Sequence, residues 1–115
     1  MKFHRPERMG HLFRKELGEM LLREFEFAGA LITLTEVEVS EDLAHAKAKI
    51  SVMPHKAEKP VLAALKKMAG HFQHELNHKL NFKPMPRLMF VLDEGLERAA
   101  AIEKDLIEIE KGVNK

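Results

Sequence analysis

This chain of 115 residues contains no cysteine, no tryptophan and no tyrosine. Without cysteine it can form neither disulfide bonds nor thiolate metal sites, and a small domain without disulfides is typical of a reducing cytoplasm. Seven phenylalanines are its only aromatic residues, so few rings remain for stacking on nucleic-acid bases. No apolar run approaches the roughly 20 residues of a membrane-spanning helix, and no basic start is followed by an apolar stretch. We therefore expect a cytoplasmic protein with no secretory signal and no membrane partner.

The net charge of +1 conceals strong segregation of charge along the chain. Residues 1–23 hold six Lys/Arg and three Glu, whereas residues 24–46 hold six acids and no Lys/Arg. Residues 47–92 hold nine Lys/Arg and two Glu, and residues 93–115 hold seven acids and four bases. Two basic segments separated by an acidic one predict one basic surface, as in a protein that binds a polyanion. The alternative is that these charges form ordinary solvated faces.

The spacing of apolar residues predicts a single α+β domain over residues 1–115. The expected order is α-β-β-α-(kink)-α-β-α. A first helix should run from Pro6 to about Phe25, and the last, acidic helix should cover about 94–111. Three strands are expected at about 32–39, 44–52 and 88–92, with a long helical stretch from about Pro60 to Asn81.

The second expected strand alternates small or apolar residues with polar ones, which predicts a sheet with one buried face. In the preceding strand the apolar residues change phase, so we expect a bulge near Thr35-Glu36. If Ser40 pairs with Leu43 across the turn, Glu36 lies opposite Lys47 and Glu38 lies opposite His45. Such cross-strand pairs would be the structural explanation for Lys47.

The long helical stretch carries two separate stripes. Its core stripe is formed by Leu62, Leu65, Ala69, Phe72, Leu76 and Leu80, and its outward stripe by Lys67, His71, His74 and His78. Gly70 lies in the interior, where glycine costs about 1 kcal/mol relative to alanine, so we predict a kink there. We expect Gly70→Ala to lower stability, as it would if the backbone φ at Gly70 is positive, and to weaken binding of the partner in parallel.

His74-Glu75-Leu76-Asn77-His78 matches the H-E-x-x-H pattern, in which two histidines bind zinc and the glutamate acts as general base. A catalytic site also needs a third ligand and a cleft, and no third ligand follows at a familiar spacing. The next residues add positive charge, which disfavours a cation site. We therefore expect an exposed His/Lys face, with weak metal binding and a small zinc protein as the alternatives, and no enzyme.

An ordered set of motifs over about residues 5–107 resembles the ribosome-binding factor A family. They are Arg5-x-x-Arg8, Thr35-x-Val37-x-Val39-Ser40-x-Asp42-Leu43 with Ala46-Lys47, the helical Leu65, Gly70, Glu75-Leu76 and Leu80, and Pro86-x-Leu88-x-Phe90-x-x-Asp93-Glu94 with Glu97 and Ile102. The resemblance implies a type II KH-like fold, with helices on one face of a three-stranded sheet. KH domains clamp the nucleic-acid backbone with a GXXG loop, which is absent from this chain. In the family a helix-kink-helix takes its place, and here it would fall at Ala69-Gly70, preceded by Met68 where the family usually has alanine.

The resemblance further implies a monomeric, non-catalytic assembly factor without a cofactor. Its partners would be the immature small (30S) ribosomal subunit and the 16S rRNA, with no DNA, and it would promote late rRNA maturation and cold adaptation. Phosphate contacts from basic side chains should supply most of the affinity. A protein-only interaction module that uses the acidic residues 93–110 is the remaining alternative. The expected RNA-binding residues are Arg5, Arg8, Arg14, Lys15, Lys47, Lys49, Lys66, Lys67, His71, His74, His78, Lys79, Lys83 and Arg87.

Overall fold

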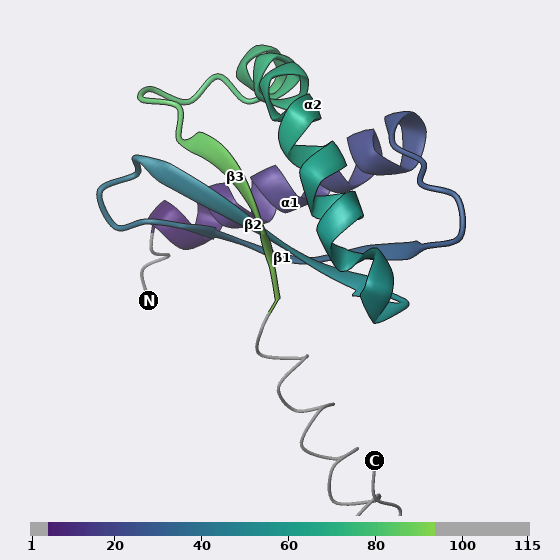
Figure 1. The fold of residues 1–115 in the computed structure, drawn as a ribbon. Coiled ribbons are helices and arrows are strands. Elements are labelled where there is room, and N and C mark those ends of the chain that lie inside the picture. The colour runs from purple at the N-terminus through teal and green to yellow at the C-terminus, as the bar shows by residue number, and fades with distance from the viewer. Residues whose placement is uncertain (1–4, 94–115) are drawn as a thin grey trace, which may run out of the picture.

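The protein folds as two helices packed on one face of a three-stranded sheet (Figure 1). In the computed structural model residues 5–93 are described, so the predicted acidic helix at 94–111 lies outside the described residues. None of the helices within residues 5–93 is long and apolar enough to cross a membrane. The elements are α1 (Arg5–Glu24), β1 (Leu31–Val39), β2 (His45–Met53), a 3-10 turn (His55–Ala57), α2 (Glu58–Lys79) and β3 (Arg87–Leu92).

The sheet has the strand order β1-β2-β3, with β1 antiparallel and β3 parallel to β2. The predicted bulge is confirmed, because the β1–β2 register shifts between Leu34 and Glu36. The predicted cross-strand partners are wrong by two residues: Glu38 pairs with Lys47, and Glu36 pairs with Lys49. A two-residue shift keeps every side chain on its predicted face, whereas a one-residue shift would not.

The connection between β1 and β2 explains this register. The backbone N–H of Ser40 donates to the carbonyl of His45 at 2.9 Å, so the hairpin closes two residues later than predicted. The Ser40 hydroxyl oxygen accepts hydrogen bonds from the N–H groups of Ala44 and His45, at 3.2 and 3.0 Å. Leu43 adopts a left-handed φ of 62° within this loop. The loop is therefore longer than a tight Ser40–Leu43 turn.

The core lies between the buried face of the sheet and the apolar stripes of the two helices. Alanines at 46 and 48 are fully buried in β2, and their small side chains let the helices lie close to the sheet. α1 lies close to β1 at Gly10, where an added Cβ would stand 2.6 Å from the carbonyl oxygen of Val37. The fully buried large side chains include Met9, Phe13, Leu17, Met20, Ile50, Leu65, Phe72 and Leu76.

α2 is one helix from Glu58 to Lys79, so the predicted division into two helices at Ala69-Gly70 is wrong. The continuous hydrogen-bonded ladder and the buried side chains of Leu65, Phe72 and Leu76 outweigh the propensity cost of one glycine. Figure 1 shows that the two halves of α2 run in different directions, so the helix bends along its length. A bend centred on Gly70 stays a prediction.

Gly70→Ala is now expected to stabilise the protein by up to about 1 kcal/mol, through helix propensity. The reason is local: φ at Gly70 is outside the left-handed region, and an added Cβ would meet no atom within 4 Å. This reverses the loss of stability expected for a positive φ. Urea unfolding followed by far-UV circular dichroism measures the difference, and a clear loss of stability would show that the bend needs glycine.

Candidate nucleic-acid interface

The exposed side of α2 forms an arc that runs from β3 to α1. At 100° per residue, Lys66, Gly70 and Asn77 fall on the β3 side, and His71 and Glu75 fall on the α1 side. The middle of the arc is formed by Lys67, His74 and His78. All of these residues except the half-buried Glu75 are exposed, which confirms the predicted outward stripe.

Lys66 and Lys67 are two neighbouring positive charges on this arc. Within residues 5–93 no carboxylate lies within ion-pair distance of either ammonium group, and both side chains are exposed. Two neighbouring charges that lack a partner in the described part of the chain are available to an anion. They are therefore the strongest candidates among the predicted RNA-binding residues.

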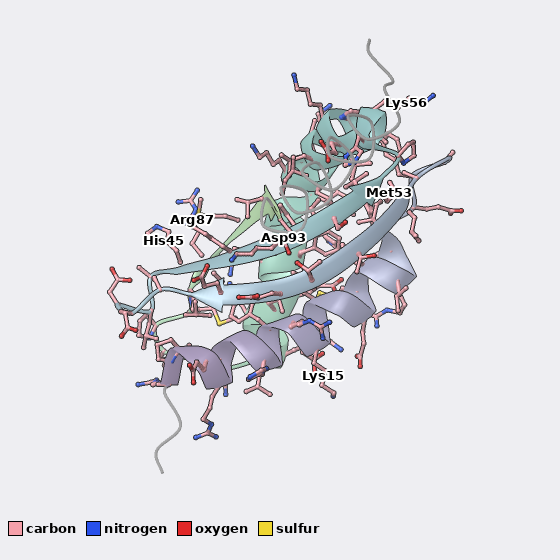
Figure 2. The ribbon with its side chains drawn as sticks, turned by 90° about the horizontal axis from the view of Figure 1, so that it is seen from below. Lys15, His45, Met53, Lys56, Arg87 and Asp93 are labelled. Carbon is pink, nitrogen blue, oxygen red and sulfur yellow. The ribbon has the colours of Figure 1, made fainter. Side chains whose placement is uncertain are left out.

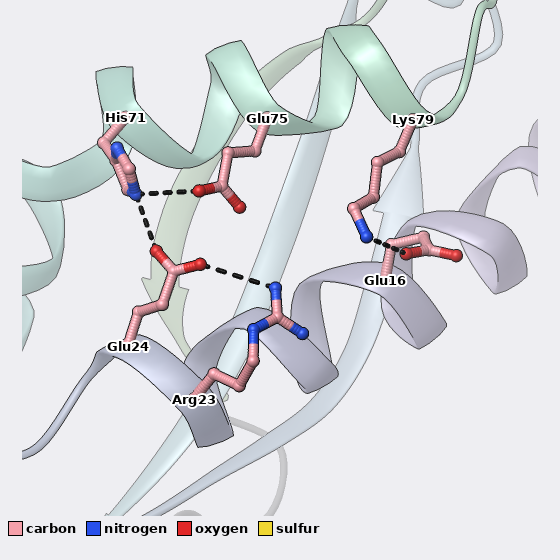
Figure 3. A network of polar contacts seen from close by, with 6 residues as sticks. All are labelled: Glu16, Arg23, Glu24, His71, Glu75 and Lys79. Atoms are coloured by element: carbon pink, nitrogen blue, oxygen red, sulfur yellow. Dashed lines mark hydrogen bonds and ion pairs between the residues drawn. The ribbon is translucent and has the colours of Figure 1, made fainter.

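Three other predicted RNA-binding residues already have carboxylate partners. Lys49 lies 3.2 Å from Glu38 and 3.9 Å from Glu36, and the Glu38 carboxylate raises the pKa of Lys49 above its usual value. Lys79 lies 3.9 Å from Glu16, and His71 contacts two glutamates (Figure 3). These charges are partly neutralised within the domain, so they offer less attraction to a phosphate than Lys66 and Lys67.

A shallow groove of about 440 Å³ separates α2 from β3. Gly70 lies on one wall and Arg87, a predicted RNA-binding residue, lies on the other. Because Gly70 has no side chain, a ligand can approach the backbone of α2 closely here. The remaining lining residues are Ala69, Gln73, Asn77, Met85 and Leu88. The groove thus combines an apolar floor with amide groups and one guanidinium.

Gln73 holds this groove together, although no pattern in the sequence points to it. Its side-chain oxygen accepts a 2.7 Å hydrogen bond from the N–H of Leu88, and its amide nitrogen donates to the carbonyl of Pro86 at 3.1 Å. The amide therefore pairs with the β3 backbone as a neighbouring strand would. Only the tertiary structure reveals this role, because Leu88 is 15 residues away in sequence.

Gln73→Ala is expected to lower the free energy of unfolding by about 1–3 kcal/mol, because it leaves the part-buried N–H of Leu88 without its partner. Asn77→Ala, one turn further along the same groove, is the matched control. Asn77 is exposed and accepts one exposed hydrogen bond from Gln73, so its loss should cost under about 0.5 kcal/mol. Equal stabilities of the two variants in urea unfolding would contradict this role.

The open face of the sheet carries a second, smaller group of basic residues. His45 and Arg87 are register partners and lie side by side at one end of the sheet (Figure 2). Lys47 follows on the same face, opposite Glu38 of β1 and Met89 of β3. The acids of β1 offset much of this positive charge, which makes the open face a weaker anion site than α2.

The predicted RNA-binding residues of α1 lie apart from the groove between α2 and β3. Arg5, Arg8, Arg14 and Lys15 are all exposed, and the Nε of Arg14 donates to the carbonyl of Thr35 at 3.2 Å. Figure 2 shows Lys15 projecting from α1 on the side remote from His45 and Arg87. Lys83 is exposed in the connection between α2 and β3. The structure therefore places Lys66, Lys67, His74 and His78 along one exposed side of α2, and it places Arg87 across the groove from Gly70.

The H-E-x-x-H residues do not converge on one point. The rings of His74 and His78 lie 4.5 Å apart between centroids on the exposed arc, and Nδ1 of His78 contacts the carbonyl oxygen of His74 at 3.0 Å. Glu75 instead faces α1, where it contacts His71 (Figure 3). A zinc-bound water activated by Glu75 between these two histidines does not fit this arrangement.

His71 joins the end of α1 to α2. Its Nε2 lies 2.6 Å from a carboxylate oxygen of Glu24 and 3.1 Å from one of Glu75 (Figure 3). The hydrogen bond with Glu24 raises the pKa of the imidazole, and the nearby charge of Glu75 adds to this effect. The same hydrogen bond lowers the pKa of Glu24. His71 is therefore engaged within the domain and is the weakest of the predicted phosphate contacts on α2.

The sheet, the two helices on one of its faces and the groove along β3 define a KH-like α+β domain. The crystal structure of ribosome-binding factor A from Thermus thermophilus has a similar fold, with a TM-score of 0.64 and 19% sequence identity. The similarity covers 76% of this chain and 94% of that one.

Sequence comparisons place this domain within one family. The family model described as "Ribosome-binding factor A" matches residues 5–106. A Ribosome-binding factor A of Gloeobacter violaceus is 36% identical over 114 residues, which cover 95% of this chain and 88% of that protein. One of Akkermansia muciniphila is 32% identical, over 96% of this chain and 89% of that protein. The chain belongs to the ribosome-binding factor A family.

Proposed function

We propose that this protein binds the immature small (30S) ribosomal subunit as a cytoplasmic monomer and promotes late maturation of its 16S rRNA, also during growth in the cold. In this proposal the exposed arc of α2 and the adjoining groove contact the rRNA backbone. The protein takes part in assembly as a binding factor and catalyses no reaction.

The observation that carries the proposal is the pair of ammonium groups at Lys66 and Lys67, which have no acidic partner within residues 5–93 and lie beside the exposed Gly70 and the groove. In a KH domain the GXXG loop clamps the backbone of several nucleotides. Here α2 continues through Gly70, so its backbone N–H groups are used inside the helix. Phosphate attraction therefore falls to the side chains, chiefly Lys66, Lys67 and Arg87.

The kind of RNA follows from the same surface. Tyr and Trp are absent, and the buried Phe13, Phe72 and Phe90 are part of the core, so base stacking contributes little. Contacts to the phosphates of a folded RNA are the remaining source of affinity, and they should weaken steeply with salt.

Sucrose-gradient sedimentation of a lysate from cells that produce this protein tests the proposal. The protein should migrate with free small subunits at low salt and return to the top of the gradient when the salt is raised. Purified subunits and purified protein should reproduce this behaviour. Migration only at the top of the gradient at low salt would overturn the proposal.

A further inference from the structure

We propose that Glu24, His71 and Glu75 form a binding site for a divalent transition-metal ion such as Zn²⁺, which would link the end of α1 to α2. One imidazole nitrogen and one oxygen from each carboxylate lie within 4.8 Å of one another (Figure 3). Two carboxylates from different helices thus converge on a single imidazole nitrogen.

The distances suit an ion of this size. A tetrahedral Zn²⁺ with bonds of about 2.0–2.1 Å separates its ligand atoms by about 3.3 Å. The Nε2 of His71 lies 3.1 Å from the Glu75 oxygen, which is close to that separation, and 2.6 Å from the Glu24 oxygen. A movement of the Glu24 carboxylate by under about 1 Å would bring its distance from Nε2 to that separation, and the third pair of ligand atoms lies within 4.8 Å.

The helices fix the ligands in position. His71 and Glu75 are four residues apart on α2, so their side chains lie on the same face of the helix. Glu24 is the last residue of α1, and its second oxygen lies 3.4 Å from the guanidinium of Arg23. A hydrogen bond to the outer oxygen of a ligating carboxylate orients it toward the metal.

Charge and solvent access also favour a cation. Two carboxylates face one imidazole and one guanidinium, that of Arg23, so the group keeps a net negative charge when His71 is neutral, as a metal ligand must be. The carboxylate side chains are only 24% and 27% exposed, whereas His71 is 51% exposed, which leaves the solvent side open for entry. A donor set of one nitrogen and two oxygens suits zinc and its neighbours, whereas Mg²⁺ prefers oxygen ligands alone.

A second pair of histidines on the same helix makes the test specific. His74 and His78 are also four residues apart, and they lie on the exposed middle of the arc rather than facing α1. The proposal therefore assigns Glu75 to a site with His71 and excludes the two histidines of the H-E-x-x-H pattern. The competing interpretation is that the three side chains form only an ion pair that joins the helices.

Zinc titration of the full chain, after removal of metal with EDTA, tests the proposal by competition with a chromophoric zinc indicator. We expect one Zn²⁺ per chain and a rise in Tm on addition of zinc, with no such rise with Mg²⁺. Glu75→Gln, which keeps the size of the side chain, and His71→Ala should each weaken zinc binding at least tenfold. The double variant His74→Ala with His78→Ala should bind zinc as the wild type does.

Two results would overturn the proposal. Absence of binding by the wild type at micromolar zinc would leave only the ion pair. Loss of binding in the His74/His78 double variant, with full binding by Glu75→Gln, would move the site to the exposed histidines. Circular dichroism shows whether each variant is folded. If His71→Ala does not fold, the Glu75→Gln variant still tests the proposal. Small-subunit binding is measured separately, so this proposal and the proposed function can fail independently.

Discussion

A protein that carries Lys66→Glu together with Lys67→Glu should bind free small subunits at least tenfold more weakly than the wild type. Each substitution replaces a positive charge by a negative one, at two neighbouring exposed ammonium groups that have no acidic partner within residues 5–93. A tenfold weakening corresponds to about 1.4 kcal/mol, which is modest for the removal of two phosphate-binding side chains. The slope of log K against log salt should also fall by about 1 for each phosphate that is no longer neutralised. Filter binding or sedimentation at several salt concentrations measures both effects.

The matched control places the same change of charge elsewhere. Lys56→Glu with Lys59→Glu alters the net charge by the same amount at two exposed lysines that are not among the predicted RNA-binding residues, and Figure 2 shows Lys56 far from Arg87. This control should retain most of the affinity and most of the salt dependence. Equal losses in the two double variants would mean that net charge alone governs binding and that the α2 surface is not the interface.

Gly10→Ala should lower the free energy of unfolding by about 2 kcal/mol. The added Cβ would stand 2.6 Å from the carbonyl oxygen of Val37, and this contact is with backbone, which cannot rotate away. α1 would have to move off β1, and the packing of Met9 and Phe13 would suffer. Overpacking of this kind costs about 1–3 kcal/mol, partly offset by up to about 1 kcal/mol of helix propensity.

Gly18→Ala makes the same substitution two turns later in the same helix and serves as the control. Its nearest neighbour would be a methyl group of Leu34 at 4.0 Å, which is an ordinary contact, so this variant should gain up to about 1 kcal/mol. Circular dichroism in urea measures both variants, since the chain has no tryptophan or tyrosine for fluorescence. A Gly10→Ala protein as stable as Gly18→Ala would show that α1 and β1 separate at little cost.

The elements and the faces of the sheet could be predicted because they depend on local periodicity. The alternation assigns Ala44, Ala46, Ala48, Ile50 and Val52 to the buried face; the last four are buried, whereas Ala44 precedes β2 and is exposed. The bulge at Thr35 is visible as a change of phase within one strand. The register between β1 and β2 is not visible in the sequence, because it depends on hydrogen bonds that the Ser40 side chain makes within the loop.

The basic residues of the candidate interface could be predicted, but not which of them are the best placed to bind a phosphate. Periodicity identifies the exposed basic stripe of α2, yet it cannot show which charges are already paired. The partner of His71 is Glu24, which lies 47 residues away in the sequence. Gln73 forms hydrogen bonds at the start of a strand that begins 14 residues later. Contacts between distant segments carry no signature in one sequence. Gly70 has a helix-breaking tendency, but a single glycine is outweighed when the flanking turns are anchored in the core.

The parallel pairing of β2 and β3 has a consequence for how this protein folds. The β1–β2 hairpin joins neighbours in sequence, whereas β3 reaches β2 only after the whole of α2 has crossed the sheet. Loop-closure entropy makes such non-local pairing slow, so β3 should dock late in folding. The walls of the groove, α2 and β3, are therefore among the last parts to be brought together. A nascent or partly folded chain would display its lysines without the groove, so selective binding should arise only when folding is complete.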